Sequence, residues 1–174
     1  NNRSDEATTL KQGIIPDIII PANSLKAGQL EAIYDVKTLS DSASSYHTAH
    51  PENAVEVRAT AVRTTYARNA RNLDKMLGHT GTEPGLVAQR LLNTHTGNVI
   101  GLVVGSFGRV SESIHTLIKQ IAERLAKEQC RNWLIDHDVA LGLITRQLNQ
   151  ELGTLIHKGW ARLMLDRLQN NTQR

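Results

Sequence analysis

The chain has 174 residues, of which 40% are hydrophobic, 21% are charged and only 3% are aromatic. This composition is typical of a soluble globular protein and argues against intrinsic disorder and against membrane-spanning helices. The length allows one domain, or a core of about 125 residues with an appendage, but not two large independent domains. The formal net charge of +3 permits a nucleic-acid partner without requiring one.

The only cysteine bears on the cellular compartment of the protein, and the first residue bears on whether the chain is part of a longer polypeptide. Cys130 excludes an internal disulfide framework, and this favours a reducing, intracellular compartment. The chain starts at Asn1 rather than at methionine, so we expect it to be part of a longer polypeptide.

Two short strands are predicted near the N-terminus. Residues 14–21 are rich in isoleucine and are bracketed by Gly13 and Pro21, which predicts a short buried strand. Pro16 removes a ladder donor and indicates an edge or a bulge. Residues 30–39 predict a second strand, and the polar loop between the two indicates a hairpin.

Helices and one further strand follow. Apolar side chains recur at helical spacing over residues 54–77 and predict a helix of about six turns, and a short helix is predicted over 85–92. The most apolar segment, 98–107, predicts a strand at the centre of a sheet, covered on both faces. A helix over 112–128 and a helical tail over 133–168 complete the chain. Ser111 is expected to be the N-cap of the first of these.

Charged residues interrupt the two N-terminal strands. Asp17 lies among isoleucines, and Asp35 and Lys37 lie on the next strand. A charge inside an apolar strand is costly unless it meets a metal ion, an opposite charge or solvent. Asp35 and Lys37 are two residues apart and therefore share one face, which a suitable hairpin register extends to Asp17. Two converging carboxylates suit Mg²⁺ or Mn²⁺, and such a site activates water against a phosphodiester.

These residues carry a resemblance to a known family. Pro16-Asp17 followed by Asp35-Val36-Lys37 resembles the P-D…(D/E)-x-K signature of the restriction-endonuclease-like nuclease superfamily, and the surrounding element order is similar to its α-β-β-β-α-β core. More narrowly, the pattern from Ile15 to Leu168 resembles the restriction-like endonuclease domain attached to reverse transcriptases in some eukaryotic retroelements. The resemblance implies an α/β fold, with a mixed central sheet flanked by helices and a C-terminal helical extension.

The resemblance also implies roles for particular residues. Asp17 and Asp35 would bind the metal ion, the backbone carbonyl of Val36 would complete the protein ligands, and Lys37 would act on the attacking water. The implied reaction is Mg²⁺-dependent (or Mn²⁺-dependent) hydrolysis of DNA phosphodiester bonds. In a eukaryotic mobile element this activity would nick target DNA in the nucleus.

The predicted helix 54–77 is strongly basic. Only two acidic residues, Glu56 and Asp74, oppose a set of five cations, namely Arg58, Arg63, Arg68, Arg71 and Lys75. Arginine at this density suits contacts with phosphate groups. In the superfamily this helix often lends a polar or basic residue to the site, for which Arg63 and Tyr66 are the candidates. The residues expected to contact DNA are therefore Arg63, Tyr66, Arg68 and Arg71.

Other interpretations stay open. Asp17, Asp35 and Lys37 also fit a structural ion-pair network without catalysis, and the basic helix also fits a solvated face. The superfamily often has an acidic residue on a helix before the first strand, where this chain offers only Asp5 and Glu6. The histidines at 47, 50, 79 and 95 lack the spacing of a zinc site.

The domain division that we expect is a nuclease-like core at 1–128 and a helical extension at 131–174. Two functions compete with the nuclease. One is a nucleic-acid-binding module that has the fold but no cleavage. The other is an oligomerisation or scaffold domain that forms a homodimer through the helical tail.

Overall fold

A computed structural model describes residues 15–39, 53–105 and 108–172. Contacts divide the chain into two compact units. The first comprises Asn1–Lys37 and Glu56–Leu102, and the second comprises Thr38–Val55 and Val103–Arg174. The fold is mixed α/β, as expected, although the contacts group the helix that follows residue 111 with the C-terminal helix rather than with the first 128 residues.

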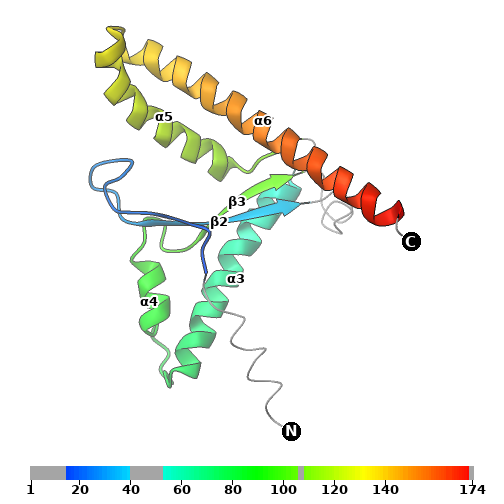
Figure 1. Ribbon diagram of the computed structural model, residues 1–174. Helices are drawn as coiled ribbons and strands as arrows, with labels where there is room; N and C mark the ends of the chain where they lie inside the picture. The colour runs from blue at the N-terminus through cyan, green and yellow to red at the C-terminus, as the bar shows by residue number, and fades with distance from the viewer. Residues whose placement is uncertain (1–14, 40–52, 106–107, 173–174) are drawn as a thin grey trace. The chain divides into compact units, whose positions relative to one another are not determined.

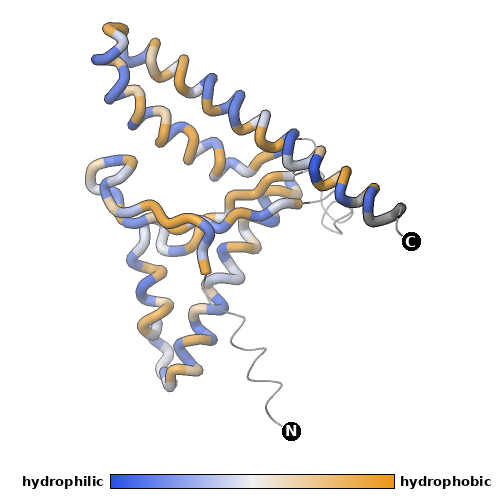
Figure 2. Tube along the Cα trace, in the orientation of Figure 1, coloured by the Kyte–Doolittle hydropathy of each residue, from blue (hydrophilic) through white to orange (hydrophobic). Residues whose placement is uncertain are grey.

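The described strands form a three-stranded sheet in the order β1-β2-β3. The strands are β1 (Ile18–Ile20), β2 (Ala32–Leu39) and β3 (Ile100–Gly105). β1 and β2 pair antiparallel, which confirms the predicted hairpin. Figure 1 shows β2 and β3 pointing the same way, so the sheet is mixed. Hydrophobic residues run along both of these strands (Figure 2).

Two expectations about the strands are wrong. β1 lies at the sheet edge, as Pro16 indicated, but the strand is not buried as expected, because Ile18 and Ile19 are 39% and 52% exposed. The strand predicted over 98–107 as central is β3, which forms the other edge of the described sheet, and the central strand is β2. β3 is nevertheless largely buried. The apolar residues of β3 therefore indicate that other elements cover the strand, and do not show that it has a neighbouring strand on each side.

The turn of the hairpin has a defined local structure. Asn23 has a left-handed φ of 63°, and its side-chain oxygen accepts a hydrogen bond of 2.8 Å from the Gly28 amide. The Asn23 amide donates to the Gln29 carbonyl at 2.9 Å. Asparagine and glycine tolerate these backbone angles, so the loop closes without strain. The closed loop fixes how β1 pairs with β2.

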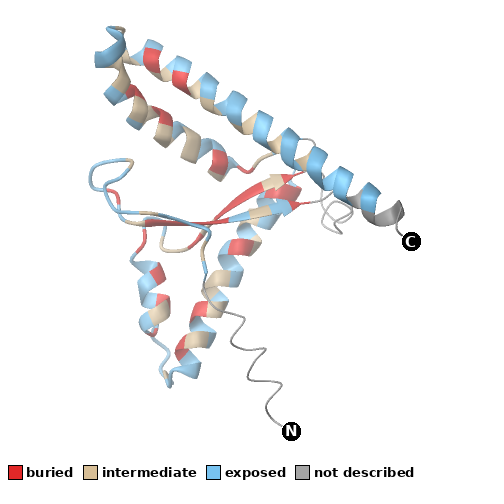
Figure 3. Ribbon diagram, viewed as in Figure 1, coloured by how far each residue is buried: buried red, intermediate tan, exposed pale blue. Residues whose placement is uncertain are grey.

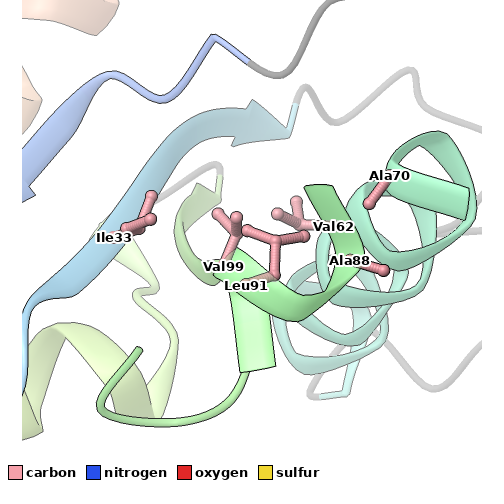
Figure 4. Close-up of a cluster of buried hydrophobic side chains, with 6 residues drawn as sticks. All are labelled: Ile33, Val62, Ala70, Ala88, Leu91 and Val99. Atoms are coloured by element: carbon pink, nitrogen blue, oxygen red, sulfur yellow. The ribbon is translucent and has the colours of Figure 1, made fainter. Parts of the chain in front are cut away.

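Helices α3 (Ala54–Met76) and α4 (Leu86–Leu92) form the core of the first unit with the strands. The bounds match the predicted helices closely. Figure 4 shows Val62 and Ala70 of α3, and Ala88 and Leu91 of α4, clustered with Ile33 and Val99. Val and Ala dominate because the chain has few aromatic residues to fill this space.

Gly101 marks a close approach between β3 and α3. A Cβ at this position would lie 2.9 Å from both the Cα and the carbonyl oxygen of Ala59. We expect Gly101→Ala to destabilise the fold by about 2 kcal/mol, because the helix backbone must move away from the strand. Urea unfolding measures the difference. The matched control is Gly142→Ala in the C-terminal helix, where a Cβ meets nothing within 4 Å, and a loss as large as that of Gly101→Ala there would contradict the explanation.

A buried carboxylate joins α3 to α4. Asp74 is 3% exposed, and its two oxygens accept hydrogen bonds from the amides of Val87 (2.8 Å) and Ala88 (2.9 Å). These amides belong to the first turn of α4, where no helical partner exists. Gly85 precedes this turn, and a Cβ there would overlap the Asp74 side chain. Asp74 thus caps α4 from another helix.

The second unit contains α5 (Glu112–Trp133) and α6 (His137–Thr172). Ser111 occupies the N-cap position of α5, but its side chain makes no cap hydrogen bond, contrary to expectation. Its Oγ accepts from the Val103 amide at 3.0 Å, and its own amide donates to the Val103 carbonyl at 2.9 Å. Ser111 is fully buried. Ser111 therefore pairs with β3 like a strand residue. Its hydrogen bonds satisfy the buried backbone amide and carbonyl of Val103, and this outweighs capping of α5.

The helix predicted over 112–128 is α5, and the helical tail predicted over 133–168 is α6. Ala122 and Ala126 pack against Ala140 and Ile144, and these small side chains let the two helices approach closely. Figure 3 shows the C-terminal half of α6 largely exposed. A homodimer through this helix stays a prediction, which the molecular mass of the intact chain in solution tests. None of the described helices is long and apolar enough to cross a membrane.

Candidate functional site

The hairpin brings the two aspartates together. The β1–β2 ladder pairs Ile18 with Tyr34, and Asp17 comes one residue before it. The Asp17 amide donates to the Tyr34 carbonyl at 3.1 Å, and its Oδ2 accepts a 2.7 Å hydrogen bond from the Val36 amide. The Asp17 carboxylate is therefore bound to the peptide that directly follows Asp35.

Asp35 is the buried member of the pair. It is 1% exposed, and the Lys37 ammonium lies 2.9 Å from its Oδ1 and 2.7 Å from its Oδ2. The two side chains share a face because they are two residues apart on β2, as the sequence predicted. The Lys37 side chain is 38% exposed, so the pair joins a buried anion to a cation that still reaches solvent. Without this cation the buried carboxylate would be strongly destabilising.

Tyr66 of α3 completes the cluster. Its hydroxyl lies 3.0 Å from Asp35 Oδ1 and 3.0 Å from the Ile15 carbonyl. Burial, the hydrogen bond to Asp35, and the charges of Asp35 and Asp17 all raise the pKa of Tyr66. The phenol therefore stays neutral, with one proton to donate. Since both neighbours are acceptors and Asp35 carries the charge, Tyr66 holds the Asp35 carboxylate in place from the helix side.

The donor set fits a hard divalent cation. Asp17, Asp35 and the backbone carbonyl of Val36, the ligands that the resemblance implies, offer oxygen atoms of the kind that Mg²⁺ prefers. The described residues contain no group of three or more His, Cys, Asp or Glu side chains suited to a metal ion, so such a site relies on two carboxylates. Asp35 Oδ2 is buried and lies 2.7 Å from the Lys37 ammonium, so a cation that bound this oxygen would displace the ammonium from it.

The basic residues of α3 form a separate feature. Arg63, Arg68 and Arg71 line a hollow of about 500 Å³ together with Lys75 and Asn98. Tyr66 does not line it, because its hydroxyl contacts Asp35 instead. Of the four residues expected to contact DNA, the structure thus places Tyr66 in the carboxylate cluster and the three arginines in the hollow. Of the two candidates for the residue that α3 lends to the site, only Tyr66 contacts an aspartate among the residues described.

Sequence reasoning missed the part that Asn98 plays in this hollow. Asn98 comes just before β3, and its Oδ1 accepts a 2.8 Å hydrogen bond from the Val99 amide. A single asparagine in a turn-rich segment gives no signal of a site. Lys75 stood among the cations of the helix but was not assigned to the site, because charge alone does not show which face of a helix is hollowed.

The histidines give no sign of a zinc site among the described residues. His79 Nε2 lies 2.6 Å from the Glu83 carbonyl oxygen within the turn after α3. His95 lies in the turn before Asn98, where its amide donates to the Glu31 carbonyl. The remaining candidates, at positions 47 and 50, lie outside the described residues, as do Asp5 and Glu6.

Comparison with known proteins adds no relative. No protein-family model matches the chain, and no curated protein and no solved structure matches it either. The nuclease resemblance therefore rests on the residues and contacts given above.

Proposed function

We propose that this chain is a metal-dependent endonuclease that hydrolyses DNA phosphodiester bonds on a restriction-endonuclease-like core. One observation carries the proposal. Two aspartates from paired strands and a lysine meet around the Asp35–Val36 peptide, where the Asp17 carboxylate binds the Val36 amide and Lys37 contacts Asp35. An isolated structural ion pair needs only Lys37 and Asp35, and does not explain a second carboxylate at the same peptide.

The residues divide the work as follows. Asp17, Asp35 and the Val36 carbonyl would hold Mg²⁺ or Mn²⁺, and such a cation would supply Lewis-acid charge toward the phosphate oxygens. Lys37 would orient the attacking water, and its partly exposed ammonium beside Asp35 supports this role. Tyr66 fixes the Asp35 carboxylate so that the ligands are preorganised.

The biological setting belongs to the same proposal. The narrower resemblance to endonuclease domains of eukaryotic retroelements favours a protein that nicks target DNA for a mobile element. In that setting the chain is part of a longer polypeptide and acts in the nucleus. The proposal for DNA as the substrate draws on the arginines of α3 as well as on the carboxylates.

Incubation of the chain with supercoiled plasmid DNA tests the nuclease. We expect nicked circles to appear with Mg²⁺ or Mn²⁺ and to disappear when a chelator is present, because the two carboxylates need a cation to act on a phosphodiester. Gel electrophoresis separates the two plasmid forms. Nicking that is equal with chelator and with metal would rule out the proposed mechanism.

A second candidate is a nucleic-acid-binding module that does not cleave. It is favoured by the direct contact between Lys37 and Asp35, which an inactive site retains as a structural pair. Such a module retards plasmid DNA in a gel without nicking it in either metal, and its affinity falls steeply with salt. The same plasmid experiment therefore distinguishes the two functions.

A further inference from the structure

Two adjoining hollows run along one side of α3 in the first unit. The larger has a volume of about 500 Å³ and carries the four cations Arg63, Arg68, Arg71 and Lys75. The smaller has a volume of about 200 Å³ and lies between α3 and α4. Arg63, Arg71, Ala67 and Asn98 line both hollows, so these are parts of one groove, which we call the α3 groove.

The cations of the α3 groove have no carboxylate partner among the described residues. The ion pairs formed by described residues of the first unit involve Lys37 and Arg90, and neither residue lines the groove. Asp74 lies nearby but is buried, with both oxygens bound to α4 amides. Arginines without a carboxylate partner on neighbouring helical turns attract an anion from outside the chain.

The row of cations is longer than one phosphate group. Arg63 and Lys75 are twelve residues apart, which corresponds to about 18 Å along a helix at 1.5 Å per residue. A small anion would use only part of this row, whereas the backbone of a nucleic-acid strand presents successive phosphates along it. The charge pattern therefore favours a polyanionic strand.

The smaller hollow adds a site for a base. Its walls are largely aliphatic, formed by Ala67, Ala70, Ala88, Leu91 and Leu92, with Arg63 and Arg71 at the side shared with the larger hollow. At about 200 Å³ it is smaller than the roughly 300–1,000 Å³ of pockets for drug-sized ligands. Asn98 Oδ1 is bound to the Val99 amide, which leaves the Nδ2 side of its amide to donate to a ring.

We propose that the α3 groove binds an unpaired DNA strand, with its phosphates along the four cations and one base in the aliphatic hollow. A base inside a duplex is stacked and paired, so only an unpaired nucleotide enters such a hollow without the cost of extrusion. The inference rests on the proposed function in taking DNA as the ligand and names the form of DNA. Binding in the groove requires neither the metal ion nor Asp17, Asp35 or Lys37.

Fluorescence anisotropy of the full chain in the presence of a chelator tests this inference. The probe is a labelled DNA of about 20 nucleotides, longer than the roughly 4–16 nucleotides that a single-strand site covers. We expect the single strand to bind about tenfold more tightly than the same sequence as a duplex. Equal affinity for the two forms, or tighter binding of the duplex, would overturn the inference.

Substitution of one groove arginine provides the matched comparison. Arg71→Gln is expected to weaken single-strand binding about tenfold and to reduce the slope of log affinity against log salt by about 0.7. Arg58→Gln removes the same charge from the same helix at an exposed position outside the groove, and we expect less than about a twofold change. Equal losses in both variants would show that only the net charge of the chain matters.

Ala67→Leu tests the contribution of the base to binding separately from that of the phosphates. Ala67 is half-buried at the junction of the two hollows, and a leucine side chain there occupies the entrance to the smaller hollow. The expected result is loss of the preference for the single strand with an unchanged salt slope. An unchanged preference would remove the base from the proposal.

The proposal for the α3 groove and the proposal for the nuclease can be refuted independently of each other. If the single strand binds as expected but plasmid is never nicked, the nuclease proposal fails and the strand-binding groove stands. Metal-dependent nicking without any preference for the single strand shows the reverse, namely a nuclease whose α3 groove does not select unpaired DNA.

Discussion

Asp35→Asn and Lys37→Gln are each expected to reduce metal-dependent nicking of plasmid DNA by at least about a hundredfold. Asp35 is the buried carboxylate of the cluster, and asparagine keeps its shape and its hydrogen bond from Tyr66 but loses the charge that a cation requires. Lys37→Gln removes the ammonium that contacts Asp35 and that we propose orients the attacking water. Because the buried carboxylate then loses its ion-pair partner, this variant is also expected to be less stable. The rate of conversion of supercoiled to nicked plasmid measures both effects.

Two controls separate chemistry from folding. Glu31→Gln neutralises a carboxylate just before β2 that forms an ion pair with Arg90 at 3.7 Å. Lys26→Gln removes an exposed cation from the hairpin loop. Both controls are expected to nick at nearly the rate of the unmodified chain. Thermal unfolding shows whether each variant is folded. Full activity in folded Asp35→Asn and Lys37→Gln would end the nuclease proposal, whatever the behaviour of the α3 groove.

Local patterns in the sequence predicted the elements that local physics determines. The helices 54–77 and 85–92 were predicted within a residue of their ends, because apolar spacing and the left-handed Gly78 are local signals. The hairpin was predicted for the same reason, since a polar loop separates two β-branched segments. Its register then brings Asp17 to the Asp35–Val36 peptide, so part of the candidate site followed from the sequence as well.

Features that depend on distant partners were not predictable. Ser111 looks like a helix cap in sequence, but its side-chain oxygen accepts a hydrogen bond from the amide of Val103, eight residues earlier, instead of capping α5. The strand 100–105 is apolar enough for a central position, yet close packing of Gly101 against Ala59 buries it from the helix side at the sheet edge. The hydrophobic pattern of a sequence indicates that a segment is buried, but it does not show which element covers the segment.

Tyr66 shows the same limit within the candidate site. The sequence left two roles open for Tyr66, a contact with DNA and a place in the carboxylate site, and its hydroxyl contacts Asp35 and the Ile15 carbonyl. The positions 63, 67 and 71 of the α3 groove follow a spacing of four residues, and Tyr66 lies on the neighbouring side of the helix that faces β2. Distinguishing these two sides requires knowing where the sheet lies.

Asp74→Ala is expected to lower the free energy of unfolding by about 2–4 kcal/mol, a larger loss than that expected for Gly101→Ala. The change leaves two amides of the first turn of α4 without an acceptor. The buried amide of Ala88 costs about 1–3 kcal/mol, and the partly buried amide of Val87 adds less because water reaches it. Urea unfolding measures the loss. Asp138→Ala removes a fully exposed aspartate from the first turn of α6 and is expected to leave the free energy of unfolding nearly unchanged.

The same substitution connects the fold to the α3 groove. Asp74 holds the start of α4 against α3, and Ala88 and Leu91 of α4 form one wall of the aliphatic hollow. When α4 is released, we therefore expect the preference for single-stranded DNA to fall, while Asp35 and Lys37 on β2 keep their contacts. A variant that loses the stability but keeps the full preference would show that the hollow does not depend on how α4 is held. Asp74 binds α4 amides and forms no ion pair with the described cations of the groove. A loss of both stability and single-strand preference in this variant would therefore come from the altered position of α4.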